Sequence, residues 1–364
     1  MRLLLTSQQI AFDADLQIVE EFDNRFRLTR HAALLAQASS LIVTRINENR
    51  FYEHTLKEIL AHIAVGRTVA FILVDNAHLT WFGLKAVVEK LYPGQFQLLN
   101  QHKQDGNLWL TLWKRIRSAP AHHTTPHTGW SFGILTLGKR LDAVGRFVSS
   151  IRKEMGDRPY EILAVVPREL AELSGQPDIR QIVFTEKDAL GWITRKKNIL
   201  CDAARFSDIL VCHDRFHLGE NFAVDFERWG YDYAVAAPQV RLAADGRRAT
   251  DWAVVGGENH TWCKGGQLPY RAHSRYAYCP GGVTILRKAA WELYPWNENL
   301  YWNEHEDVEL VRRIQRGGEI LRLAPVTVLA DEDRWIDQNP RLGYDLHNEV
   351  LQGPASVELT VNWQ

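Results

Sequence analysis

The chain has 364 residues, of which 46% are hydrophobic and 24% are charged, and its formal net charge is −1. This composition excludes an intrinsically disordered protein, and the length suits roughly two domains with cores of their own. A net charge near zero excludes a general attraction to nucleic acid or anionic lipid, so a polyanionic ligand would need a local site.

The cysteines and the first residues bear on the compartment. Cys201, Cys212, Cys263 and Cys279 form no CxxC pair, which argues against a zinc ribbon and against a disulfide framework. The start, MRLLLTSQQIAF, has too short an apolar run for a signal peptide, and no later segment approaches about eighteen apolar residues. We therefore expect reduced thiols and a cytoplasmic protein, with peripheral association at the inner face of a membrane left open.

The first part of the chain alternates between strand and helix patterns. LIVTRI (41–46) and TVAFILVD (68–75) predict buried strands, and helical periods cover 52–64 and 81–92. QFQLLN (95–100) and LWLTLWKR (108–115) predict an antiparallel hairpin, because Asp105-Gly106 between them is a strong turn signal. The sequence thus predicts a small α/β domain over residues 1–117.

This order of elements resembles the second half of a class I S-adenosylmethionine methyltransferase. The glycine-rich turn that would hold the cofactor in the first half of that fold is missing, since no GxGxG-like sequence follows a strand here. The resemblance therefore implies a methyltransferase-like remnant or a docking scaffold.

Residues 118–130 are predicted to form a linker between two domains. The stretch RSAPAHHTTPHTG (117–129) carries two prolines and three histidines and has no apolar period. Because the histidines have no fixed spacing, they indicate a solvated linker and not a metal site.

After the linker the alternation starts again. Strands are predicted at 131–137, 161–167, 179–185 and 208–212, with helices through 144–154 and 194–206. Such a run predicts a mostly parallel sheet with helices on both faces, in which ligands bind at the carboxyl ends of the strands. His213-Asp214-Arg215 follows the last of these strands, where a diphosphate with Mg²⁺ or Mn²⁺ would suit a single carboxylate. A local ion pair in a strand-end turn is the alternative interpretation.

The stretch YWNEHEDVELVRRI (301–314) places three carboxylates in front of apolar residues at helical spacing. Asn303 and Glu306 have the form of an N-cap and capping box, which predicts a helix start. Basic residues followed by Gly317-Gly318 predict the end of the same helix. The carboxylates either complement the positive helix end or carry chemistry.

Together these segments resemble the GT-A glycosyltransferases, especially the inverting family-two-like enzymes, over about residues 131–330. The chain has a strand with Thr136 near its end, a helix with Lys197-Asn198, the acidic strand end at Asp214, and then YCPGGVTILRKAAWELYPWNENLYWNEHEDVELVRRI, in the order of that family. The resemblance implies a GT-A domain, with its Rossmann-like nucleotide-diphospho-sugar transferase fold, over residues 131–364, with a polar tail from about 331.

The resemblance and the local chemistry assign roles to ten residues. The metal would be held by Asp214 with His213, and the catalytic pair facing the acceptor would be Asp307 and Glu306. The contacts to the nucleotide-sugar donor would come from Thr136, Lys197, Asn198, Arg215, Gly281 and Gly282.

The chain departs from the family pattern at three places. Cys212 stands where the family often has the first aspartate of its metal motif, and Arg168 precedes Glu169 where an acidic residue usually reads the nucleoside. A histidine often completes the metal site, but His260, His273 and His347 have no assigned place.

Asp307 is the predicted general base, because inverting transfer needs one group to take the proton of the acceptor hydroxyl. In the first turn of a helix, the macrodipole is expected to lower the pKa of this carboxyl, which leaves it ionised but weak. Its effect would then come from positioning, which supplies roughly 7 to 11 kcal/mol in favourable cases. Glu306 either satisfies the capping box or binds acceptor hydroxyls.

The predicted function is transfer of a sugar from a nucleotide sugar to a glycan or lipid-linked saccharide, in polysaccharide biosynthesis and without a nucleic-acid partner. Two other classes stay open. A nucleotidyltransferase would show a glycine-rich phosphate loop, of which TLGKRLD (136–142) is a faint version. A noncatalytic assembly or binding subunit that kept the fold is compatible with the single aspartate at 213–215.

Overall fold

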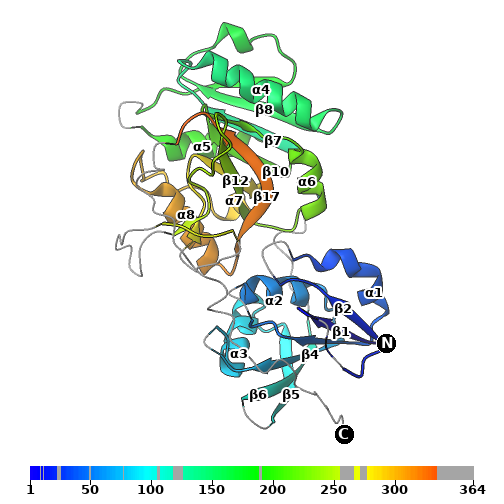
Figure 1. The fold of residues 1–364 in the computed structure, drawn as a ribbon. Coiled ribbons are helices and arrows are strands. Elements are labelled where there is room, and N and C mark those ends of the chain that lie inside the picture. The colour runs from blue at the N-terminus through cyan, green and yellow to red at the C-terminus, as the bar shows by residue number, and fades with distance from the viewer. Residues whose placement is uncertain are drawn as a thin grey trace. The chain divides into compact units, whose positions relative to one another are not determined.

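The computed structural model describes residues 1–8, 10, 12–22, 26–48, 51–76, 78–104, 107–117, 126–187, 191–254, 266–270 and 277–333. These residues form two compact units, the first ending at Arg117 and the second starting at Pro126 (Figure 1). No helix in the described ranges is long and apolar enough to cross a membrane.

The first unit is built on a six-stranded sheet with the order β2-β1-β3-β4-β6-β5. Strands β1 to β4 run parallel to one another, whereas β6 is antiparallel to both β4 and β5. The elements in chain order are β1 (Arg2–Thr6), β2 (Leu16–Val19), the 3-10 helix η1 (Leu28–His31), α1 (Ala32–Gln37), β3 (Ser40–Thr44), α2 (Tyr52–Ala61), β4 (Thr68–Val74), α3 (Trp81–Leu91), β5 (Phe96–Lys103) and β6 (Leu108–Arg115).

Apolar residues cover both faces of this sheet. Leu3 and Leu5 of β1 face a core shared with α2 and α3, and Leu4 between them faces a second, smaller cluster. The predicted strands and helices of this part are confirmed, as is the antiparallel pairing of β5 with β6. The turn residues Asp105-Gly106 lie outside the described residues, as do residues 118–125 of the predicted linker.

The second unit is built on an eight-stranded sheet with the order β11-β17-β12-β16-β10-β7-β8-β9, beside a small sheet of β14-β13-β15. Its strands are β7 (Trp130–Leu135), β8 (Tyr160–Val166), β9 (Ile179–Val183), β10 (Asp208–His213), β11 (Phe216–Leu218), β12 (Val235–Leu242), β13 (Ala253–Val254), β14 (Gly266–Gln267), β15 (Ala277–Tyr278), β16 (Val283–Arg287) and β17 (Leu321–Ala330). Its helices are α4 (Leu141–Met155), η2 (Ala171–Leu173), α5 (Ile193–Ala203), α6 (Phe222–Trp229), α7 (Lys288–Leu293) and α8 (Glu306–Arg316).

The eight-stranded sheet is mixed. Strands β10, β7, β8 and β9 are parallel, as predicted, and β12 pairs in parallel with β17. Strand β16 runs antiparallel between β10 and β12, and β11 runs antiparallel to β17. Helices α5 and α6 lie on opposite sides of the central strands (Figure 1). The predicted α/β class is confirmed for both units.

The pairing of β12 with β17 was not predicted from the sequence. Pro238 lies in β12 and Pro325 in β17, and a proline inside a strand pattern argues against a central strand. The ladder between these strands is irregular where the prolines lie, since Ala237 pairs with Leu323 and the next pair joins Gln239 to Thr327. The irregularity lets the two strands remain paired on either side of the prolines.

Candidate functional site

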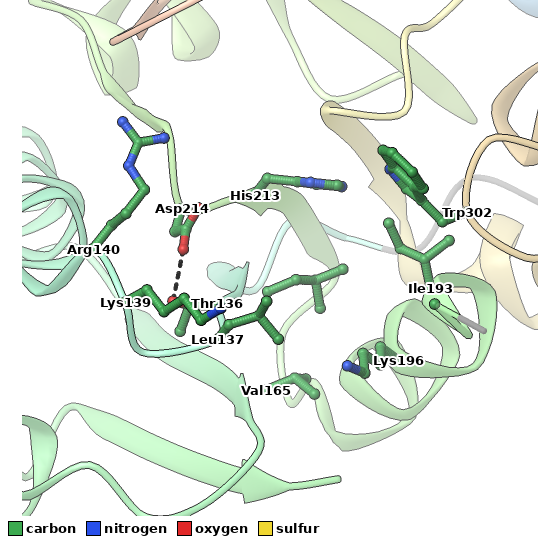
Figure 2. A pocket seen from close by; sticks show the side chains of 12 residues that line it. Thr136, Leu137, Lys139, Arg140, Val165, Ile193, Lys196, His213, Asp214 and Trp302 are labelled. Carbon is green, nitrogen blue, oxygen red and sulfur yellow. Dashed lines mark hydrogen bonds between the residues drawn. The ribbon is translucent and has the colours of Figure 1, made fainter. Parts of the chain in front are cut away.

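The carboxyl ends of the neighbouring parallel strands β7 and β10 bring Thr136 and Asp214 together. The Thr136 Oγ1 hydroxyl donates to Asp214 Oδ2 at 2.8 Å and accepts from the Gly138 backbone N–H at 3.0 Å. Figure 2 shows this hydrogen bond at the edge of a cavity. The second oxygen of the Asp214 carboxylate is the one left to meet a ligand from the cavity.

This first cavity has a volume of about 320 Å³. Its wall is apolar where Leu135, Val165 and Ile193 contribute, and Trp302 lies at its far side (Figure 2). Cationic side chains complete the lining: Lys139, Arg140 and Lys196. An apolar wall with cations beside it suits a ligand with a flat apolar part and an anionic part, such as a nucleotide.

The side chains of His213 and Asp214 point in different directions (Figure 2). In Figure 2 the His213 ring points toward Trp302, whereas the Asp214 carboxylate points toward Thr136. Cys212, the preceding residue, is buried in the core, and burial raises the pKa of its thiol. His213 and Asp214 both line the first cavity, and the role of His213 as a metal ligand stays a prediction.

The donor set at Asp214 suits a cation only in part. Across the described ranges, no group of three or more His, Cys, Asp and Glu side chains is placed to hold a metal ion. A single carboxylate can still anchor Mg²⁺ or Mn²⁺ when phosphate oxygens and water supply the other ligands. Asp214 fits that role. His260, His273 and His347 lie outside the described residues.

A second cavity, of about 300 Å³, adjoins the first. Ile193, His213 and Trp302 line both of them. The predicted residues that line the second cavity are Arg215, Gly281, Gly282, Glu306 and Asp307. The structure therefore brings the acidic pair and the glycine pair to one cavity, next to the cavity that holds Thr136 and Asp214.

Both glycines of the pair leave space that another side chain needs. A Cβ on Gly281 would come within 2.6 Å of Glu306 Oε1. A Cβ on Gly282 would come within 2.8 Å of Arg215 Nη2, whose guanidinium carbon lies 4.8 Å from the centre of the Phe216 ring. The absence of a Cβ at both positions lets these charged side chains approach the backbone closely.

Helix α8 starts later than predicted. It begins at Glu306, so Asn303 is not its N-cap and no capping box forms. Asn303 and His305 both have left-handed backbone conformations, with φ of 70° and 61°. The loop before the helix is instead held by the Tyr301 N–H, which donates to Glu304 Oε2 at 2.8 Å. The predicted helix end is confirmed, since Gly317 follows the last residue of α8.

Asp307 is half-buried and held by two backbone donors. Its Oδ2 accepts from the Gly281 N–H at 2.6 Å and its Oδ1 from the Val308 N–H at 2.8 Å. Burial, followed by the charge of neighbouring Glu306, raises the pKa of Asp307 to about 7. The expected lowering of this pKa is wrong, because desolvation and a like charge outweigh the backbone donors and the helix end.

Lys197 does not reach the first cavity. Its side chain is 1% exposed, and its Nζ donates to Glu306 Oε1 at 2.9 Å and to the Gly281 carbonyl at 3.0 Å. Lys197 is among the lining residues of neither cavity, and its predicted contact with the donor stays a prediction.

Asn198 lines neither cavity. Its Oδ1 accepts from Trp291 Nε1 at 3.0 Å and from the Trp296 N–H at 2.9 Å. Its Nδ2 donates to the Trp296 carbonyl and to Glu298 Oε1, each at 2.9 Å. The predicted donor contact of Asn198 stays a prediction. These hydrogen bonds anchor the segment between α7 and α8.

Sequence reasoning missed four residues of the first cavity: Lys139, Arg140, Lys196 and Trp302. Lys196 lies within a run of charged residues in the predicted helix, and the turn 138–142 carries only a faint phosphate-loop pattern. Trp302 was one of several aromatic residues near the acidic pair. A usable signal for Lys139 and Arg140 was their place just after the first strand of the domain, where parallel sheets bind ligands.

The sequence matches no protein-family model and no curated protein. Three solved structures show a partial likeness. GalNAc-T7 with UDP, GalNAc and Mn²⁺ is 14% identical over 60% of this chain and 45% of that chain, with a TM-score of 0.44. S. aureus TarS 1-349 is 11% identical over 56% and 60% of the two chains, with a TM-score of 0.39. Mannosyltransferase PcManGT from Pyrobaculum calidifontis, in complex with GDP-Man and Mn²⁺, is 12% identical over 60% and 61%, with a TM-score of 0.38.

The chain thus spans between 45% and 61% of the length of these three structures. With TM-scores below 0.5, the likeness carries no argument about activity.

Proposed function

We propose that this chain is a GT-A-type glycosyltransferase that moves a sugar from a nucleotide sugar to a glycan or lipid-linked saccharide, with inversion at the anomeric carbon. The observation that carries the proposal is the pair of adjoining cavities. One contains the strand-end pair Thr136 and Asp214, and the other contains the half-buried carboxyl of Asp307. Transfer between two substrates needs two such neighbouring sites.

The first cavity is the proposed donor site. Its apolar wall suits a nucleoside, and Lys139, Arg140 and Lys196 supply positive charge for a diphosphate. A divalent cation held by Asp214 would stabilise the negative charge that develops on the diphosphate leaving group. Arg215, at the neighbouring cavity, is a further cation on the path between the two substrates.

The second cavity is the proposed acceptor site, with Asp307 as the general base. The acceptor hydroxyl oxygen forms a bond to the anomeric carbon while its proton passes to Asp307. The bond from that carbon to the diphosphate oxygen breaks on the opposite face, and the leaving nucleoside diphosphate keeps the electron pair. Atoms and charge balance without any further reactant.

The raised pKa of Asp307 suits this role. A general base is most effective when its pKa lies near the working pH, and positioned bases contribute about 10² to 10⁴-fold to rate. Since the pKa of Asp307 is about 7, it is a stronger base than an ordinary aspartate and is still partly ionised at neutral pH. The two backbone donors from Gly281 and Val308 fix its orientation.

The first unit is proposed to act as a docking scaffold. The antiparallel strand β6, which lies between β4 and β5 in an otherwise parallel sheet, supports the resemblance to a methyltransferase-like remnant. Cytoplasmic location at the inner face of a membrane and a place in polysaccharide biosynthesis stay predictions.

Thermal unfolding with nucleotides tests the proposal. Wild type and Asp214→Ala are compared with UDP, GDP, CDP, TDP and CMP, each with Mn²⁺ and with EDTA. A ligand at about one hundred times its dissociation constant adds roughly 2.7 kcal/mol to the free energy of unfolding. We expect one nucleotide to raise the midpoint of the wild type in Mn²⁺ and to lose this effect in Asp214→Ala. No shift with any nucleotide would favour the noncatalytic assembly subunit.

A further inference from the structure

We infer that Lys197 is a positioning residue of the proposed base: its buried ammonium neutralises Glu306 and holds the Gly281 backbone that orients Asp307. Because Asp307 is the base of the proposed transfer, this inference rests on the proposed function. It differs from the sequence-based role of Lys197 as a donor contact.

The first step is the burial of the lysine. Lys197 projects from α5 with 1% of its side chain exposed, and a buried ammonium is costly unless it is paired and hydrogen-bonded. Its Nζ has the carboxylate of Glu306 at 2.9 Å and the carbonyl of Gly281 at 3.0 Å. It also lies 5.4 Å from the centre of the Trp296 ring. The protein therefore provides the buried ammonium with a carboxylate, a carbonyl oxygen and an aromatic ring as partners.

These contacts form a closed ring of interactions, which we call the circuit. Lys197 bonds to Glu306 and to the Gly281 carbonyl, and the Gly281 N–H donates to Asp307 Oδ2 at 2.6 Å. Since Glu306 and Asp307 are adjacent in the chain, the circuit joins α5, the first turn of α8 and the loop before β16. Movement of Lys197 would be passed on to the carboxylate of Asp307 through Gly281.

The third step is electrostatic. Glu306 and Asp307 are neighbouring carboxyls, and the charge of Glu306 raises the pKa of Asp307 while that of Lys197 lowers it. Without the lysine, two adjacent carboxyls would share a half-buried place with no cation between them. Two carboxyls this close oppose each other's ionisation, which often raises the pKa of one of them by more than about one unit. Asp307 would then be protonated over more of the neutral range.

The other groups around Asp307 do not replace the lysine. Burial, together with the charge of Asp307, raises the pKa of Tyr278 in β15 and of the Cys279 thiol that follows it, the latter to about 12. Burial lowers the pKa of His305, which precedes the acidic pair. Arg215 and Asp333 line the same cavity with opposite charges.

The test is a ¹³C NMR titration of the Asp307 carboxyl in the full chain, assigned with Asp307→Asn. We expect Lys197→Met to raise the titration midpoint of Asp307 by about one pH unit or more. The double variant Lys197→Met with Glu306→Gln should bring the midpoint back toward that of the wild type, because both charges of the pair are then removed. Lys196→Met, one residue away but lining the other cavity, is the matched control and should leave the midpoint in place.

The inference is overturned if folded Lys197→Met keeps the wild-type midpoint, since a purely packing role would not involve the charge. If Lys197→Met does not fold, Glu306→Gln alone decides: removal of the like charge should lower the midpoint, and an unchanged midpoint contradicts the circuit. Where turnover is measurable, the acidic limb of the pH-rate profile should move with the NMR midpoint. Absence of turnover with every nucleotide sugar would contradict the proposed function and leave the titration result standing.

Discussion

The strand ends of the two units use polar residues in different ways. In the first unit, Asn47 follows β3 and donates to the Val74 carbonyl at 2.6 Å, and Asn76 follows β4 and donates to the Asn47 carbonyl at 2.7 Å. The carboxylate of Asp75 accepts from the Trp81 N–H at 2.7 Å. In the second unit, Thr136 and Asp214 bond to each other at 2.8 Å and line a cavity.

This difference teaches that polar residues after parallel strands do not by themselves mark a ligand site. The asparagines and Asp75 of the first unit satisfy backbone groups of the loops that they belong to, which is the common use of such side chains. Asp214 has one oxygen directed at another side chain and none committed to backbone among the described contacts. The proposed chemistry therefore lies in the second unit.

The largest expected effect is on turnover in Asp307→Asn. Removal of a positioned general base costs about 10² to 10⁴-fold in rate. The matched control is Asp75→Asn in the first unit, which keeps an acceptor oxygen for the Trp81 N–H and should retain wild-type turnover. Steady-state transfer from the nucleotide sugar found in the thermal screen measures both. Equal rates in wild type and Asp307→Asn would remove Asp307 from the mechanism.

Gly281→Ala is expected to lower turnover less. The added Cβ would meet Glu306 Oε1 at 2.6 Å and Asp307 Cβ at 3.3 Å, so the acidic pair has to shift. A misplacement of about 1 Å in a catalytic group can cost about 10²-fold, which sets the upper limit. Gly145→Ala on α4 is the control, because nothing lies within 4 Å of its added Cβ. It should keep full turnover and gain about 0.5 to 1 kcal/mol of stability.

Paired asparagine variants compare the two units through stability. Asn198→Ala leaves Trp291 Nε1 and the Trp296 N–H without their acceptor, and each buried unsatisfied group costs about 1 to 3 kcal/mol. Asn47→Ala should cost a similar amount in the first unit. Thermal unfolding with and without the stabilising nucleotide measures the stability of both variants. Asn47→Ala should keep the full shift of the unfolding midpoint that the nucleotide causes. Loss of that shift in Asn47→Ala would mean that the first unit takes part in donor binding.

A further expected effect is a pH-dependent gain of stability in Asp307→Asn. The pKa of Asp307 is raised from 3.8 to about 7, so the folded protein binds more protons than the unfolded chain between these pH values. The free energy of unfolding of the wild type therefore falls as pH rises through this window, by a term that Asp307→Asn lacks. Unfolding midpoints from pH 4 to pH 8 should show the variant gaining on the wild type, with the difference complete above about pH 7. A constant difference would contradict the raised pKa.

Much of the fold was predictable from local pattern. The strands β3, β4, β7, β8, β9 and β10 and the helices α2 to α5 were predicted because buried strands and amphipathic helices have distinct apolar periods. Asp214, Gly281, Glu306 and Asp307 were predicted as site residues from their order along the chain, and the structure gathers them around two adjoining cavities. Their catalytic roles stay proposals.

Other features depend on contacts that no local pattern contains. Strands β12 and β17 pair across an irregular ladder at their prolines, and the first turn of α8 forms at Glu306 because the preceding loop is held from within. Lys196 and Lys197 are neighbours with the same charge, yet one lines the first cavity and the other pairs with Glu306, which lines the second.

The sequence alone therefore determined the alternating α/β order and the residue types at the proposed site. The first follows from the spacing of apolar residues, and the second from the chemistry of the side chains. Only the tertiary structure decided the partner of each charge. It placed Glu306 from α8 against Lys197 from α5 and buried the Asp307 carboxyl beside them. The burial of Asp307 raised its pKa where the helix end alone would have lowered it. Desolvation depends on everything that surrounds a group, and the folded chain assembles those surroundings from segments more than one hundred residues apart (Lys197 and Glu306, |i−j| of 109).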